Sequence, residues 1–247
     1  MKQIIKMSFD LYKRRFASII AVYALALVIN YGASTVWFLS VPASWLVGGI
    51  LAVYFVYEAQ GSPKTVNEAI EIGKRGFARL LGANALITLY CLLWALIPIA
   101  GAFIAISKYY SYCFAPNIAY DRPNLPLSEC LKQSERLARG RRREMFTADL
   151  VIMGLPAILL AVALILFYVV ILYGATVISL LALIIILPAL GGIFLLGPLQ
   201  CLVRARYFID CEMLDGYGGS DTPFIVYENP VEDEAAPEES FDKKQET

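Results

Sequence analysis

The stretch "LLALIIILPALGGIFLLG" occupies residues 180–197 and is apolar at nearly every position. It lies inside a run of 54 residues without a charge, from residue 150 to residue 203. A membrane β-strand alternates apolar and polar residues over about 10 positions, and this stretch does not alternate. Because only helices and closed barrels satisfy their backbone hydrogen bonds in lipid, the stretch predicts a transmembrane helix.

Two further uncharged runs come earlier in the chain, at residues 16–57 and 80–107. A helix that crosses about 30 Å of hydrocarbon needs roughly 20 mostly apolar residues. The first and last runs are each long enough for two helices, and the middle run reaches two if its helices include flanking residues. The sequence predicts an all-α membrane protein with six transmembrane helices as three hairpins. The expected spans are residues 16–38, 43–60, 77–97, 101–120, 147–172 and 176–203.

Charge divides the chain into two parts. The whole chain has 21 basic and 21 acidic residues, but residues 210–247 hold 12 acidic residues and two lysines. The last part therefore has a net charge of −10 and the rest of +10. A segment so rich in acidic residues, Gly and Pro does not bury enough apolar surface to fold alone. We predict a transmembrane domain over residues 1–212 and a disordered acidic cytoplasmic tail over residues 213–247.

The stretch "ARGRRREMF", residues 138–146, stands just before the longest apolar run. Its arginines belong to one of four basic stretches, residues 2–15, 64–79, 108–143 and 204 onward, whereas the predicted turns inside the hairpins carry no charge. Cytoplasmic loops of membrane proteins are enriched in Lys and Arg. We therefore expect a multi-pass protein of the cell membrane with both termini in the cytoplasm.

The arginines of this stretch are predicted to anchor the fifth span on the cytoplasmic side. Anionic lipid headgroups are their expected partners, at about 1 kcal/mol per residue near the surface. A specific phosphate or ligand site is the alternative. The residues concerned are Arg139, Arg141, Arg142 and Arg143.

Charged segments that precede the hairpins are predicted to be short amphipathic helices. Residues 8–25 and 69–86 match at six of eighteen positions, which suggests a repeated unit. The second such helix begins either at Ser62 or at Thr65, where Glu68 completes a capping box. A later one has Pro126 in its first turn. Residues 127–137 place apolar side chains near one face, which predicts a helix lying on the inner leaflet; a solvated linker helix is the alternative.

Residues 109–154 carry a series of motifs: "YSY" followed by "AP" at the end of a predicted span, then "DRP", then a helix that leads through Phe146 into the next span. The closing stretch "GPLQCLVRARYFID", residues 197–210, adds a Pro followed by Arg-Ala and a Tyr-Phe pair. In these features the chain resembles a bacterial integral membrane family known only as domain of unknown function 975. The resemblance covers roughly residues 1–212, and it implies six transmembrane helices and no assigned activity.

Residues able to do chemistry are few. The chain has no histidine, and its five cysteines form no close pair, so no catalytic residue, cofactor or metal site is predicted. Asp149 is expected to form a salt bridge with one of the nearby arginines. Polar residues inside spans usually bond across helices, at roughly 0.6 kcal/mol each. The candidate intramembrane polar site consists of Asn84, Thr88, Asp149 and Gln200.

These features favour a non-enzymatic accessory or scaffold protein. Its basic face would contact anionic lipid, its acidic tail would contact that face or a cytoplasmic protein partner, and no nucleic-acid partner is expected. The rival hypothesis is a small-molecule or lipid transporter, with a path formed by the sixth helix and by polar groups of the third. Pro188 and Pro198 either break the sixth helix, as in known transporter sites, or only kink it, which is the commoner outcome. A transporter should have a polar cavity at mid-membrane that reaches Asn84, Thr88 or Gln200, whereas a scaffold should be packed solid there.

The charge pattern generates a topology prediction. Single cysteines introduced into the predicted turns of the hairpins should react with a membrane-impermeant thiol reagent added outside intact cells, whereas cysteines in the basic stretches and the tail should not. The opposite pattern would overturn the orientation. The outer positions are Ala43, Gly101 and Gly174, and the inner ones are Gly61, Gly140 and Gly219.

Overall fold

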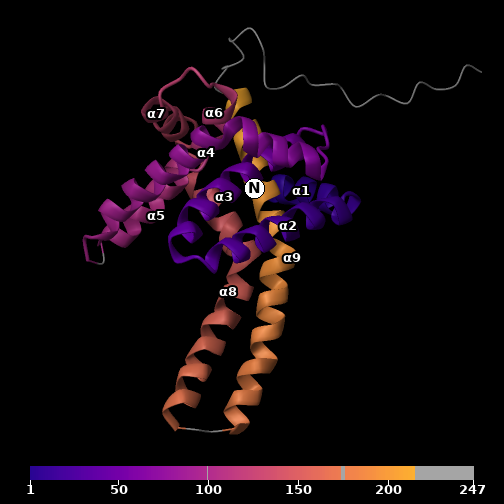
Figure 1. Ribbon diagram of the computed structural model, residues 1–247, viewed down its shortest axis with the longest axis vertical. Helices are drawn as coiled ribbons and strands as arrows, with labels where there is room; N and C mark the ends of the chain where they lie inside the picture. The colour runs from indigo at the N-terminus through magenta and orange to yellow at the C-terminus, as the bar shows by residue number, and fades with distance from the viewer. Residues whose placement is uncertain (99, 174–175, 215–247) are drawn as a thin grey trace, which may run out of the picture.

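The computed structural model describes residues 1–98, 100–173 and 176–214, and within these ranges the chain forms helices and turns without a strand (Figure 1). Of the predicted tail, residues 213–247, the first two residues are described as the end of a helix, and residues 215–247 lie outside the described residues, as do residues 174–175 of a predicted turn. The helices are α1 (Lys2–Arg14), α2 (Phe16–Ser34), α3 (Trp37–Ala59), α4 (Val66–Ala95), α5 (Ala100–Tyr112), α6 (Ala115–Asp121), α7 (Leu127–Leu137), α8 (Arg142–Tyr173) and α9 (Thr176–Leu214).

In the described part of the chain, five helices are long and apolar enough to cross a membrane: α2, α3, α4, α8 and α9. The helical class predicted from the sequence is therefore confirmed. The five helices overlap the first three and the last two of the predicted spans. The fourth predicted span, residues 101–120, is not among them, and the count of six spans stays a prediction.

The fourth predicted span is divided into α5 and α6 by a turn at Cys113 and Phe114. Pro116 explains the division, because it has no N–H to donate to the carbonyl of Tyr112 and its ring would collide with that carbonyl in a continuous helix. Ser134 of α7 satisfies the freed backbone: its hydroxyl donates to the carbonyl of Ser111 at 2.8 Å and accepts from the Phe114 amide at 3.2 Å.

Arg79 of α4 holds the far end of α6. Its Nε donates to the carbonyl of Ala119 at 3.2 Å, and its Nη2 donates to the carbonyls of Arg122 and Leu125 at 2.9 and 2.5 Å. Basic side chains commonly satisfy the last carbonyls of a helix in this way. Arg79 therefore fixes the turn between α6 and α7, in addition to contributing to the basic stretch seen in the sequence.

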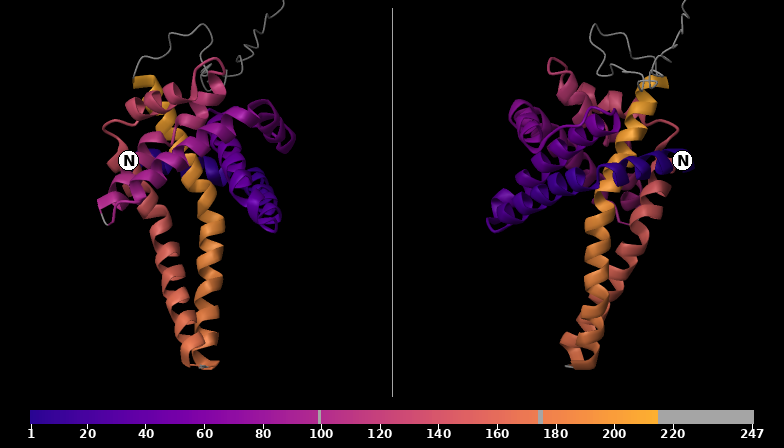
Figure 2. Two further views of the ribbon diagram at one scale, coloured as in Figure 1. Left: turned by 60° about the vertical axis from the view of Figure 1, so that its left-hand side comes forward. Right: turned by 90° about the vertical axis from the view of Figure 1, so that its right-hand side faces the viewer.

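Helix α9 is the central packing element. It runs beside α8, and the pair extends well beyond the other helices (Figures 1 and 2). It also packs against α1 and α3, and the buried core includes Leu202 and Tyr207 of α9, Tyr54 and Phe55 of α3, and Phe114. The elements that meet around α9 are therefore distant in the sequence.

Two outcomes were open at Pro188 and Pro198, a broken helix or a helix that continues past them, and α9 continues from Thr176 to Leu214 through both prolines. An interior proline removes one backbone hydrogen bond, and neighbouring side chains in a membrane protein can compensate. The hydroxyl of Tyr12 in α1 donates to the Leu195 carbonyl at 2.7 Å, one residue from the carbonyl that Pro198 leaves unpaired. This bond also attaches α1 to α9.

The helices that precede the spans differ from one another. The first, α1, ends at Arg14 and α2 starts at Phe16, whereas the second continues without interruption through α4. Thr65 caps α4 with the expected capping box: its amide donates to Glu68 Oε2 at 2.7 Å, and the Glu68 amide donates to Thr65 Oγ1 at 3.4 Å. Pro126 is the residue before α7 and does not lie in its first turn.

Helix α7 does not present its apolar face to lipid, so the prediction of a helix lying on the leaflet is wrong. Cys130, Leu131 and Ser134 are buried, and α7 packs against α6, α5 and α4. The face that the sequence pattern identified is covered by the protein itself, because the break between α5 and α6 offers it a surface to pack on.

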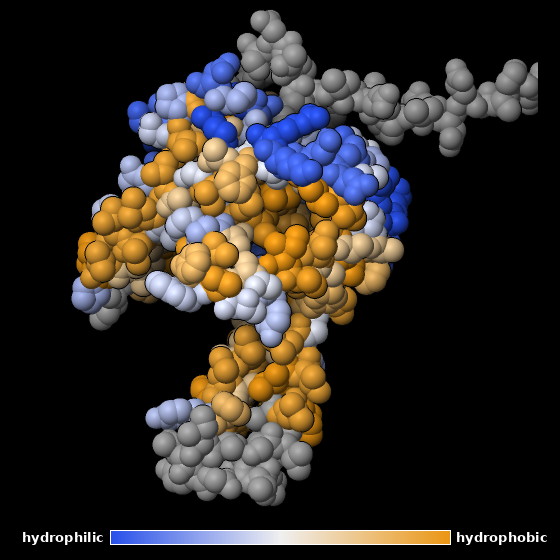
Figure 3. Space-filling view, in the orientation of Figure 1, coloured by the Kyte–Doolittle hydropathy of each residue, from blue (hydrophilic) through white to orange (hydrophobic). Residues whose placement is uncertain are grey.

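The molecular surface separates by polarity. Hydrophilic residues gather around the end that carries α7, and hydrophobic residues cover most of the remainder, including the part of the α8 and α9 pair that is drawn in colour (Figure 3). Large apolar side chains on that pair, such as Leu155, Ile165, Ile184 and Leu187, are mostly exposed. Such exposure on a helix pair is expected of a surface that lipid covers.

The close approach of α3 and α4 generates a stability prediction. A Cβ at Gly49 would lie 2.9 Å from Leu80 Cβ and 3.0 Å from Asn84 Nδ2, whereas a Cβ at Gly48 would meet no atom within 4 Å. Gly49→Ala should therefore destabilise the protein by about 1 to 3 kcal/mol through overpacking. Gly48→Ala, the control, should not, and thermal unfolding in detergent measures both. Equal stability of the two variants would contradict this packing.

Candidate functional site

The predicted salt bridge of Asp149 forms with a different arginine. Arg204 of α9 donates to Asp149 Oδ2 from Nη2 at 2.6 Å and from Nε at 3.1 Å, so the prediction of a partner among residues 139–143 is wrong. Seven residues separate Asp149 from Arg142, which is about 10 Å along a helix. Arg142 instead lies 3.5 Å from Glu135 of α7.

Two neighbouring tyrosines of α5 complete this arrangement. The Tyr110 hydroxyl donates to Asp149 Oδ2 at 2.7 Å, and Arg204 Nη1 donates to the Tyr109 hydroxyl at 2.7 Å. The guanidinium carbon of Arg204 lies 5.3 and 5.7 Å from the two ring centres, within the range of a cation–π interaction. Asp149 is only 6% exposed, and its pair with Arg204 connects α5, α8 and α9.

The arginines predicted to contact headgroups divide into two groups. Arg139 and Arg143 are exposed, whereas Arg141 and Arg142 are half-buried. Glu135, the partner of Arg142, also accepts from Lys108 Nζ at 2.8 Å, and this hydrogen bond is the main reason that the pKa of Glu135 is lowered. Arg142 therefore helps to join α7 to α8, and headgroup contact stays a prediction for the cluster.

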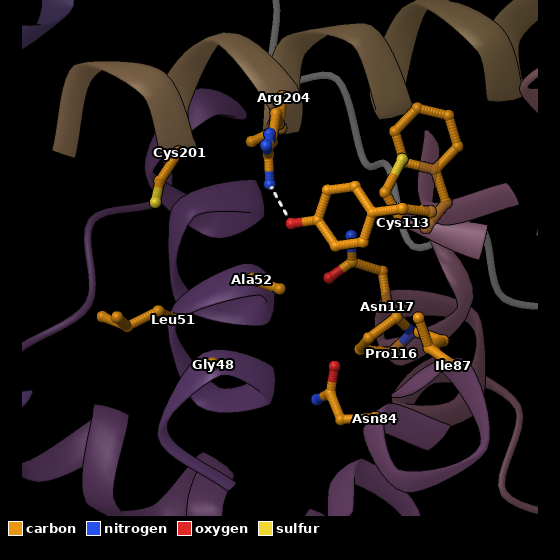
Figure 4. Close-up of a pocket in the computed structure, with 13 residues that line it drawn as sticks. Gly48, Leu51, Ala52, Asn84, Ile87, Cys113, Pro116, Asn117, Cys201 and Arg204 are labelled. Carbon is orange, nitrogen blue, oxygen red and sulfur yellow. Dashed lines mark hydrogen bonds between the residues drawn. The ribbon is translucent and has the colours of Figure 1, made fainter. Parts of the chain in front are cut away.

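A cavity of about 230 Å³ lies beside Arg204, between α3, α4, α9 and the segment that joins α5 to α6 (Figure 4). Its polar lining residues are Asn84, Tyr109, Asn117 and Arg204. Its apolar lining includes Leu51, Ala52, Ile87 and Phe114. The pocket is therefore a mostly apolar space with a few polar groups, the composition typical of small-molecule sites.

Asn84 is the one predicted polar-site residue that lines this cavity. Its Nδ2 donates to the carbonyls of Trp45 at 2.8 Å and Leu80 at 3.2 Å, which leaves the amide oxygen directed into the cavity (Figure 4). Thr88 is exposed and donates to the Asn84 carbonyl of its own helix at 2.9 Å. Gln200 is half-buried on α9 and is not a lining residue.

Asn117 was not predicted, and it is the most informative residue of the cavity. Its side chain points into the cavity (Figure 4) and is 4% exposed, and its Oδ1 has no hydrogen-bond partner among the described residues. A buried acceptor without a partner costs about 1 to 3 kcal/mol. The feature of the sequence that could have identified it is its place directly after Pro116. This proline breaks the helix, and the Asn117 side chain is turned inward as a result.

Two thiols also face this space. Cys113, from the turn between α5 and α6, and Cys201, from α9, line the cavity and are free. Among the described residues no group of three potential metal ligands of the His, Cys, Asp and Glu types occurs. The arrangement offers hydrogen bonds, one paired cation and apolar contact to a bound molecule.

Five long apolar helices around a core of this kind indicate an integral membrane protein. Comparison with known protein families, with curated proteins and with solved structures gave no match. The resemblance described from the motifs of residues 109–154 therefore stays a prediction.

The contact of Asp149 with Arg204 generates a prediction about coupling. Asp149→Leu or Arg204→Leu alone leaves one charge without its partner. Each should lower the free energy of unfolding by roughly 2 to 4 kcal/mol. This loss is smaller than for a fully buried ion pair, because Arg204 faces a cavity. The double variant should lose less than the sum of the two losses. Unfolding in detergent measures all three, and additive losses would show that the two residues are not coupled.

Proposed function

We propose that this integral membrane protein binds a small molecule in the cavity beside Arg204 and belongs to the transporter class. The observation that carries the proposal is a cavity that reaches Asn84 and holds the unpaired acceptor of Asn117. A transporter was expected to have a polar cavity at mid-membrane, and a scaffold was expected to be packed solid there. The cavity reaches Asn84 but its lining is mostly apolar, so it is the open space itself, with its few polar groups, that supports the transporter class over a solid scaffold.

The position of the cavity supports this proposal. Its walls come from helices of separate predicted hairpins. Arg204 in one wall is hydrogen-bonded to Tyr109 of another wall and to Asp149 of α8, which lies outside the cavity lining. A molecule that bonds to Arg204 competes or cooperates with those contacts, so binding is linked to the relative positions of α5, α8 and α9. Such a link between a ligand and helix positions is what alternating access needs.

We also propose six spans, with both termini in the cytoplasm. Five crossings would place the two termini on opposite sides of the membrane, whereas the charge pattern places both in the cytoplasm. The sixth crossing would therefore be made by α5 and α6 together. The exposed Arg139 and Arg143 would then contact anionic headgroups of the inner leaflet, and the acidic tail would contact this basic face or a cytoplasmic protein. No enzymatic role is proposed.

A single-cysteine experiment tests whether the cavity admits small molecules. In a full-length variant that keeps only Cys201, the small reagent methanethiosulfonate ethylammonium should modify the thiol, because Cys201 lines the cavity. A variant that keeps only Cys130, which is fully buried elsewhere, is the control and should react at least tenfold more slowly in folded protein.

Filling the cavity provides the second arm of this experiment. Adding Ala52→Trp to the variant with Cys201 should slow its modification at least tenfold, since Ala52 lines the same space. Mass spectrometry of the intact protein measures the extent of reaction. Equal rates for Cys201 and Cys130 would refute the proposal and return the scaffold to first place.

A further inference from the structure

We infer that the cavity takes a small, net-neutral dipolar molecule of the ω-amino acid class, with its carboxylate at Arg204 and its ammonium group at Asn84 and Asn117. The inference rests on the proposed function, since it names the ligand of that same cavity. It follows from where donors, acceptors and apolar groups lie around the space.

The end of the cavity at Arg204 offers donors. A guanidinium has five N–H groups, and three of those on Arg204 are used by Asp149 and Tyr109. The other two have no acceptor among the described residues. The Tyr109 hydroxyl accepts from Arg204, and its own proton likewise has no acceptor in the described part of the chain. A carboxylate matches these donors, because arginine binds it with paired hydrogen bonds.

The opposite end offers acceptors. The orientation of the Asn84 amide is set by its two hydrogen bonds to backbone carbonyls, so the group that faces the cavity is its oxygen and not its nitrogen. Asn117 contributes the buried Oδ1 without a partner. Figure 4 shows Asn84 across the cavity from Arg204, with Asn117 between them. A ligand group with several N–H bonds matches both oxygens, and since Asn117 Oδ1 is itself closed to solvent, this side chain has to turn toward the ligand to bond it.

The charge of the site selects a ligand without net charge. The +1 charge of Arg204 is already balanced by Asp149, at 2.6 Å. A simple anion would bring a second negative charge close to Asp149, and a simple cation would bring a charge that the two neutral amides do not balance. An uncompensated charge in a site of low polarity is costly. A zwitterion supplies both groups and leaves the net charge of the site unchanged.

The middle of the cavity suits a hydrocarbon segment. Leu51, Ile87 and Phe114 line it together with Pro116. Apart from Asn117 and the weakly polar thiols of Cys113 and Cys201, the described lining between the two ends is apolar. A short methylene chain that joins a carboxylate to an ammonium group would contact these side chains.

The test uses three probes of matched length on the purified full-length protein in detergent. These are γ-aminobutyrate, butyrate, which lacks the ammonium group, and butylamine, which lacks the carboxylate. Isothermal titration should show binding of γ-aminobutyrate at least tenfold tighter than of the other two. Glycine, the shortest homologue, should bind more weakly than γ-aminobutyrate, because its two charged groups are too close together to reach Arg204 and Asn84 at once.

Variants assign the two ends. Asn117→Leu should weaken γ-aminobutyrate binding at least tenfold and leave butyrate binding unchanged, whereas Arg204→Lys should weaken both. Thr88→Val is the control and should change neither, because Thr88 lies outside the cavity. Equal binding of butyrate and γ-aminobutyrate by the unaltered protein would overturn the inference and indicate an anion site.

The failure of this inference can be told from the failure of the proposed function. If Cys201 reacts as expected but none of the ω-amino acids slows its modification or binds in titration, the cavity is accessible and the ligand class is wrong. If Cys201 is unreactive, the proposed function itself fails. Slower modification of Cys201 in the presence of γ-aminobutyrate, with no effect of butyrate or butylamine, supports both.

Discussion

The ion pair between Asp149 and Arg204 is the constraint on which the arrangement of the helices depends. A carboxylate that is almost fully buried needs a partner, and the partner comes from α9, 55 residues later in the chain. The same Asp149 oxygen accepts from Tyr110, and Arg204 reaches Tyr109. Satisfying one charge therefore determines how α5, α8 and α9 face one another, and it leaves one edge of the guanidinium at the cavity.

A second constraint shapes the opposite wall of that cavity. Pro116 prevents a continuous helix, and the turn that results is held from two sides, by Ser134 of α7 and by Arg79 of α4. These contacts give α7 a supporting role under the site, which explains why its apolar face is turned inward. The turn also directs Asn117 into the cavity, where a straight helix would have carried it elsewhere.

The cavity is a better guide to function than the surface is. Exposed apolar side chains are expected of any protein in lipid, and exposed arginines of any cytoplasmic loop. An interior space with oriented amide oxygens is different, because the oxygen of Asn117 is buried and forms no hydrogen bond within the described chain. This is the observation on which the proposed binding function rests.

By itself the sequence determined the features that depend on composition and on near neighbours. Long uncharged runs required membrane helices, and Thr65 with Glu68 specified a helix start, because a capping box involves residues only three apart. Only the tertiary structure decided that Asp149 pairs with Arg204, that α9 stays continuous and that Asn84 and Asn117 share a cavity. Those outcomes depend on the rotation and register of packed helices. In spans that are apolar on nearly every face, the pattern of residues does not specify which face meets which neighbour.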